Sequence, residues 1–260
     1  MRLRMITWLV IVAACSTKSE PKPRAEPAVI PSAGSGSAAP PVEPAPAKAP
    51  PDAPTLKEHM SEHFAAVSEL QRAIARGHLD EAKTHARWLV GHDEKLLAEW
   101  QPFVDEMRAA AKDVANAPDL PTAGGLAARL GRACSRCHEA RSAVVTFVWA
   151  PVPDEAPSLQ VQMKRHQWAA ARLWEGLVGP SDELWTQGTS VLATANLDTF
   201  AAAGATPRGD VAALAAKVRD LAKRATTMTD QDTRQKLYGE LLSTCAGCHQ
   251  LVRPNPVPGP

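Results

Sequence analysis

The sequence predicts an all-α protein built from two tandem four-helix bundles. Its periodic segments are rich in Ala and Leu, and strand-forming residues are sparse. The second part of the chain repeats the first, and each copy contains four amphipathic segments. Each copy also closes with a C-x-x-C-H motif, at residues 134–138 and 245–249.

The first 14 residues are predicted to be an export signal. A basic start precedes an apolar run that is too short to span a bilayer as a mature helix. The run ends at Cys15 and resembles the bacterial lipobox, which implies that Cys15 carries the lipid of a membrane anchor facing the periplasm. Ser16 after it resembles the pattern for sorting to the outer membrane. The alternative is an ordinary cleaved signal with a chance cysteine.

Residues 15–54 are predicted to be a disordered tether. They are mostly Pro, Ala, Ser and Gly, and they lack the apolar periodicity needed to offset the entropy cost of ordering. The two domains expected after it span 55–150 and 151–260. The formal net charge of +1 gives no basic surface that would indicate a nucleic-acid partner.

Two constant offsets relate the copies. At an offset of 103, Met60 and His63 match Met163 and His166, and at an offset of 111 the two C-x-x-C-H motifs coincide. The second copy has therefore gained eight residues, which we place in the Gly- and Pro-containing loop around 195–209.

Helical periodicity and breaker residues divide each copy into four helices. Gly77 ends the first helix of the first copy, and the Gly179–Pro180 pair forms the matching turn in the second. A Pro-containing linker near 151–157 joins the copies. The predicted helices span about 55–76, 79–90, 103–116 and 123 onward in the first copy, and 158–178, 181–194, 208–227 and 230–250 in the second.

The C-x-x-C-H spacing predicts covalent attachment of two haem c groups. The two thiols of each motif add to the porphyrin vinyl groups, and the histidine that follows binds the iron. Disulfides or zinc would explain the cysteines but leave the paired histidines without a role. With Cys15 lipidated and the other four cysteines bound to haem, no free thiol remains. The predicted haem-binding residues are Cys134, Cys137, His138, Cys245, Cys248 and His249.

A four-helix unit with this motif on its last helix resembles the class II cytochromes c, the cytochrome c′ family. The resemblance covers residues 56–141 and 159–251 in outline, and only the haem motif is specific. It implies that His138 and His249 are the proximal iron ligands. It also implies that the first helix of each copy supplies the distal position, with either an apolar residue or a methionine.

This chain departs from the family because each copy has a histidine there. His63 and His166 share a helix face with Met60 and Met163, one turn away. We predict His63 and His166 as distal ligands, with the methionines or an open iron as alternatives. The choice affects the reduction potential, since a thioether ligand raises it. Four histidines without a counterpart are expected to be surface residues or local partners, namely His59, His78, His85 and His92.

Two cations on the third helix of each copy also recur. They are expected to pair with haem propionates or to form a solvated helix face. They are Arg108, Lys112, Arg219 and Lys223.

The sequence therefore predicts an electron carrier that exchanges electrons with redox partner proteins and is not an enzyme. Six-coordinate iron suits electron transfer, and no acid–base constellation is evident. A dihaem peroxidase or oxidoreductase, and a gas-binding or sensing protein, are the alternatives.

Overall fold

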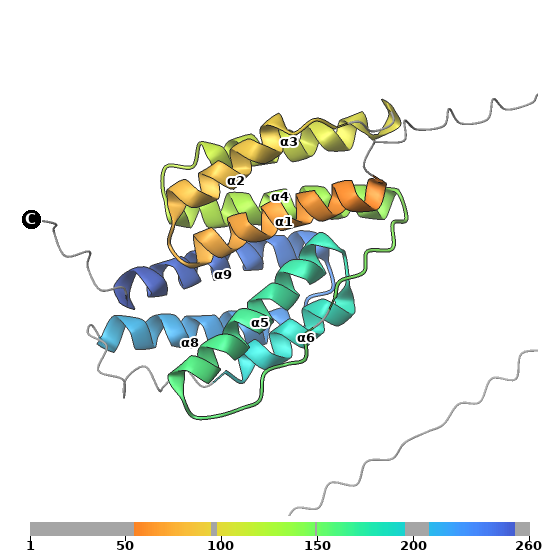
Figure 1. The fold of residues 1–260 in the computed structure, drawn as a ribbon. Coiled ribbons are helices and arrows are strands. Elements are labelled where there is room, and N and C mark those ends of the chain that lie inside the picture. The colour runs from red at the N-terminus through yellow and green to blue at the C-terminus, as the bar shows by residue number, and fades with distance from the viewer. Residues whose placement is uncertain (1–54, 95–97, 149, 196–207, 253–260) are drawn as a thin grey trace, which may run out of the picture. The chain divides into compact units, whose positions relative to one another are not determined.

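The computed structural model describes residues 55–94, 98–148, 150–195 and 208–252. Within these ranges the secondary structure is entirely helical (Figure 1). The all-α class predicted from the sequence is therefore confirmed for the described residues. The predicted signal, the lipidation site Cys15 and the tether lie outside the described residues.

In the first copy, helices form where the apolar periodicity and the breakers predicted them. A short 3-10 helix, Ala98–Trp100, leads into the third α-helix and was not predicted. The α-helices are α1 (Leu56–Ala75), α2 (Leu79–Gly91), α3 (Gln101–Ala115) and α4 (Leu120–Ala140).

The second copy repeats this order. Its last helix is two residues longer at its C-terminal end than predicted, and the others agree within one or two residues at each end. The helices are α5 (Leu159–Val178), α6 (Asp182–Ala193), α8 (Arg208–Ala225) and α9 (Gln231–Val252).

Side-chain caps fix the N-termini of several helices. Thr55 and Glu58 form a capping box at α1, and Ser158 and Ser181 accept backbone N–H bonds at the starts of α5 and α6. Asp119 does the same for α4. These caps satisfy N–H groups that have no partner within the helix.

The turn after α1 requires glycine. Gly77 has φ +79°, a conformation that L side chains rarely adopt. His78 N–H donates to Ala73 O at 2.8 Å and Gly77 N–H donates to Ile74 O at 2.8 Å, which together form a Schellman motif. The first helix therefore ends at the residue that the sequence predicted.

Within each copy, consecutive helices pack side by side, from α1 to α4 and from α5 to α9. The most extensive packing between helices joins the copies, along α4 and α9. Ser243 Oγ donates to Pro121 O at 2.9 Å and Arg132 Nε donates to Asp232 at 2.7 Å, so the two helices run antiparallel.

Small residues allow α4 and α9 to approach closely. A Cβ added to Gly124 would lie 3.0 Å from the backbone of Ser243, and one added to Gly239 would lie 2.9 Å from Gly125 Cα. Trp174 of α5 packs against Gly131 of α4. The two repeats consequently share one buried apolar core.

Candidate functional site

The first C-x-x-C-H motif occupies the last turns of α4. Cys134 and Cys137 lie three residues apart on this helix, partly buried, and are not joined by a disulfide. Burial, with a smaller contribution from neighbouring Cys137, raises the pKa of Cys134 to about 12. Burial also raises the pKa of Cys137. Both side chains are therefore neutral thiols at physiological pH in this structure.

The second motif lies toward the end of α9 in a similar environment. Burial followed by the neighbouring Cys248 raises the pKa of Cys245 to about 12, and burial raises that of Cys248. Neither cysteine is in a disulfide. The structure thus gives both motifs the same helical setting, and a disulfide does not occupy either of them.

His138 is oriented by a residue of the other copy. Its Nδ1 lies 2.8 Å from the carbonyl oxygen of Val178, at the C-terminal end of α5. A carbonyl oxygen can only accept, so Nδ1 carries the proton and donates. Nε2 is then the atom with a lone pair available for a metal, the usual arrangement of a metal-binding histidine.

His166 and His249 lie close to one another. Burial, followed by the charge of His249, lowers the pKa of His166 to about 4. The Nδ1 atom of His166 is buried without a hydrogen-bond partner. A buried, neutral imidazole with such an atom can serve as a metal ligand. The structure therefore brings together the predicted distal and proximal residues of the second copy.

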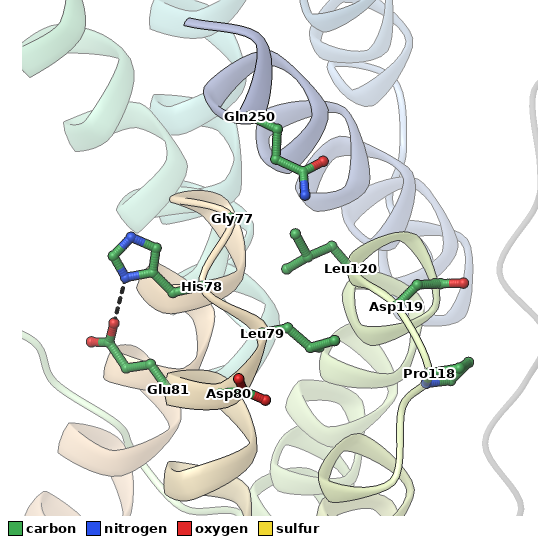
Figure 2. A pocket seen from close by; sticks show the side chains of 9 residues that line it. All are labelled: Gly77, His78, Leu79, Asp80, Glu81, Pro118, Asp119, Leu120 and Gln250. Carbon is green, nitrogen blue, oxygen red and sulfur yellow. Dashed lines mark hydrogen bonds and ion pairs between the residues drawn. The ribbon is translucent and has the colours of Figure 1, made fainter. Parts of the chain in front are cut away.

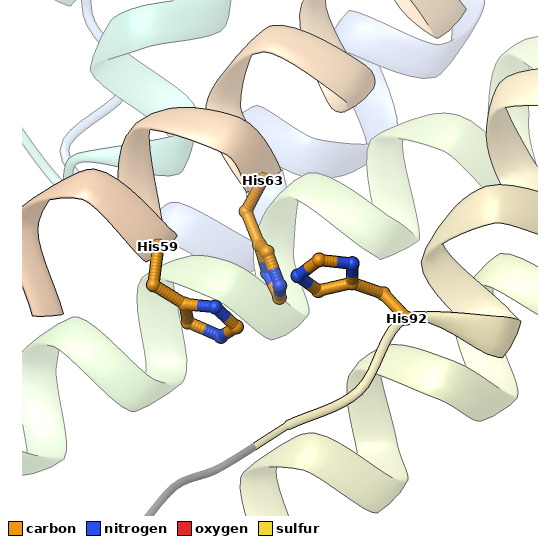
Figure 3. A group of neighbouring side chains, drawn as sticks. All are labelled: His59, His63 and His92. Atoms are coloured by element: carbon orange, nitrogen blue, oxygen red, sulfur yellow. The ribbon is translucent and has the colours of Figure 1, made fainter. Parts of the chain in front are cut away.

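His63 has different surroundings. Its Nε2 lies 2.9 Å from Glu94 Oε1, and its ring contacts those of His59 and His92 at centroid distances of 4.5 and 5.2 Å (Figure 3). His59 Nε2 lies 2.6 Å from Glu94 Oε2. Burial raises the pKa of Glu94, but the two neighbouring imidazoles together lower it below its usual value.

Two of the four unmatched histidines thus belong to a cluster that the sequence did not predict. His59 is buried, which corrects the expectation of a surface residue, and His92 is partly buried. The sequence signal that could have revealed this cluster is the four-residue spacing of His59 and His63, which places both on one face of α1. His78 pairs with nearby Glu81 at 2.7 Å and is thus a local partner, as expected.

The predicted propionate partners differ in their surroundings. Arg108 donates from Nη2 to His92 O at 2.7 Å, which ties α3 to the histidine cluster. Lys112 and Lys223 are exposed, as a solvated helix face predicts, and Arg219 is partly buried.

An open pocket of about 600 Å³ lies beside the second motif (Figure 2). It is formed by the turn between α1 and α2, the start of α4 and the end of α9. Leu79 and Leu120 contribute apolar side chains, and Gln250 follows His249 directly. Its rim is polar, and it was not predicted from the sequence.

Within the described ranges, no helix has both the length and the apolar character needed to cross a bilayer. Comparison of the chain with protein-family models, with curated proteins and with solved structures gave no match of any kind.

Proposed function

We propose that this protein is an exported dihaem c-type cytochrome that transfers electrons between redox partner proteins outside the cytoplasm. The observation that carries the proposal is the duplicated C-x-x-C-H motif, present at matching places on the last helix of each copy. In the second copy, His166 of the first helix lies near enough to His249 of the motif for the charge of His249 to lower its pKa. A histidine of the first helix close to the motif supports a haem held at this position.

The proposed haem-binding residues are the thiols and histidines of the two motifs. Cys134 and Cys137, and likewise Cys245 and Cys248, would form the thioether bonds. His138 is favoured as a proximal ligand because its hydrogen bond to Val178 O leaves Nε2 for iron. His249 would have the same role in the second copy.

On the distal side, His166 is the proposed ligand in the second copy, with Met163 as the alternative. Its buried Nδ1 without a partner supports this assignment. In the first copy His63 is the proposed ligand and Met60 the alternative. The Glu94 carboxylate beside His63 fits a hydrogen-bond partner of a metal-binding imidazole.

Haem iron, when bound, supplies a one-electron redox couple whose potential is set by its axial ligands and surroundings. The contribution of this chain is to hold the ligands, to bury the iron and to exclude water. The helix order and the place of the motif support a pair of four-helix units similar to cytochrome c′. A lipid at Cys15 would tether the protein to a membrane, most simply the outer membrane on its periplasmic side.

A dihaem peroxidase is a second candidate, favoured by one observation. The distal regions of the two copies differ, because Glu94 places a carboxylate beside His63 and is buried there. A carboxylate in this position is a possible acid–base group over an iron. Hydrogen peroxide turnover that is lost in Glu94→Gln would favour this function over electron transfer alone.

The test uses the full chain, produced in a host that matures c-type cytochromes. We expect an intact mass that includes two tetrapyrroles and low-spin spectra in both oxidation states. His166→Ala should convert the haem of the second copy alone to high spin, and His63→Ala is the matched variant in the first copy. A chain without added tetrapyrrole would end the proposal.

A further inference from the structure

We propose that His59, His63 and His92, with Glu94 as the carboxylate that orients two of them, form a binding site for one divalent transition-metal ion of the zinc class, separate from the haem motifs.

The four side chains converge from two segments. His59 and His63 lie one turn apart on α1, and His92 follows α2 as its C-terminal cap, in extended backbone. Figure 3 shows the three imidazole rings turned toward a common space. Each histidine has a ligand nitrogen that lies within 4.8 Å of one on each of the others. A small inward movement of these three nitrogen atoms would place them around a single ion.

Glu94 orients two of the ligands. Its side chain is 2% exposed, and its two oxygens lie 2.6 Å from His59 Nε2 and 2.9 Å from His63 Nε2. Metal-binding histidines usually have such a partner on the ring nitrogen that does not bind the ion, which leaves Nδ1 of both rings for the metal. Three imidazoles provide nitrogen donors that suit zinc, copper and nickel, and a zinc site with three histidines takes a water as its fourth ligand.

Neighbouring residues hold the ligands in place. Trp88 stacks on His92 with a centroid distance of 4.1 Å, and its ring edge meets His63 at 6.0 Å. Arg108 Nη2 donates to the backbone oxygen of His92 at 2.7 Å, so α3 fixes the backbone at this ligand. Such outer contacts reduce the cost of ordering ligands when an ion binds.

The site belongs to the first copy alone. The position that matches His59 in the second copy is Gln162, and His92 has no counterpart there. An imidazole nitrogen binds one ion at a time. The proposal therefore rests on the alternative assignment within the proposed function, in which Met60 and not His63 is the distal ligand of the first haem.

The experiment is a titration of the untagged, haem-loaded protein with Co²⁺ after treatment with a chelator. Calorimetry and the visible ligand-field absorption of Co²⁺ measure binding. We expect one ion per chain in a four-coordinate spectrum. His59→Ala and His92→Ala should each weaken binding at least tenfold, and neither residue belongs to the proposed haem ligands.

A control variant separates the site from general histidine binding. His78→Ala removes another His–Glu pair of the same copy. It should bind Co²⁺ as the parent does. Circular dichroism of each variant verifies its helical content. Absence of a Co²⁺ complex in the parent, or equal affinity in His59→Ala and the parent, overturns the proposal.

Failure of this proposal is distinguishable from failure of the proposed function, because the intact mass reports haem attachment in the same sample. A chain that lacks tetrapyrrole but binds one Co²⁺ through His59 and His92 supports the metal site and rejects the cytochrome. A dihaem chain that does not bind Co²⁺ gives the opposite result.

Discussion

The matched histidines His63 and His166 occupy the same place in the repeat, and their surroundings differ. His166 is partly buried close to His249, and its Nδ1 atom is buried with no hydrogen-bond partner. His63 shares Glu94 with His59 in a cluster of imidazoles. The difference arises from residues outside the repeat correspondence, since His59 is matched by Gln162. Duplication thus preserved a residue, while its neighbours changed what that residue can do.

Two ion pairs at matching places in the repeat also differ in their surroundings, here in how deeply they are buried. Glu69 and Arg72 of α1 correspond to Arg172 and Glu175 of α5, with the charges exchanged. The pair on α1 is about 40% exposed, and the hydrogen bond to Arg72 lowers the pKa of Glu69. The pair on α5 is buried, and burial raises the pKa of Glu175 to about 7. The same spacing therefore gives opposite pKa shifts.

The largest expected effect comes from the cysteines. Replacing Cys134 and Cys137 by Ala should remove one covalent tetrapyrrole, and replacing Cys245 and Cys248 should remove the other. Each double variant loses both thioether bonds of one motif and none of the other. Intact mass measures the result, and haem retention at a motif without its cysteines would contradict the assignment.

Next in size is a test of the shared core. Leu130 and Leu241 are matched residues and are 0% and 1% exposed. Changing either one to Ala should lower the free energy of unfolding by about 2–5 kcal/mol, because each leaves a cavity. Urea denaturation measures the loss. Because the copies share one core, each variant should show a single transition; two transitions with only one shifted would mean independent halves.

The pH dependence of stability tests the buried pair. The folded-state pKa of Glu175 is raised from 4.5 to about 7, so between these values the folded state binds a proton that the unfolded state has lost. Stability therefore falls as pH rises through this window, by roughly 1–3 kcal/mol from this group. Glu175→Gln should remove that fall, as measured by urea denaturation at several pH values. An unchanged slope would show that Glu175 is ionised in the folded protein.

The smallest effect is expected at the exposed pair. Glu69→Gln removes an i, i+3 ion pair on the surface of α1, which contributes about 0.2–0.5 kcal/mol. The same denaturation series should show this small loss and its weakening in high salt. If Glu69→Gln lowered the free energy of unfolding as much as a core leucine variant does, solvent exposure would not explain the difference between the two ion pairs.

Local sequence signals accounted for most of the helices. Gly77 and the Gly179–Pro180 pair are short-range features, so they reveal where helices end without any knowledge of packing. The 3-10 turn Ala98–Trp100 was missed because it has no apolar periodicity of its own. The repeat also predicted the helical setting of both C-x-x-C-H motifs.

By itself, the sequence determined the helical fold class, the duplication and the placement of both cysteine motifs, because these depend on residue order and spacing. Tertiary structure alone decided which distant residues meet. The antiparallel contact of α4 and α9, the hydrogen bond from His138 to Val178 and the approach of Glu94 to His59 and His63 depend on how helices pack. Periodicity tells which face of a helix is buried and does not tell which partner buries it.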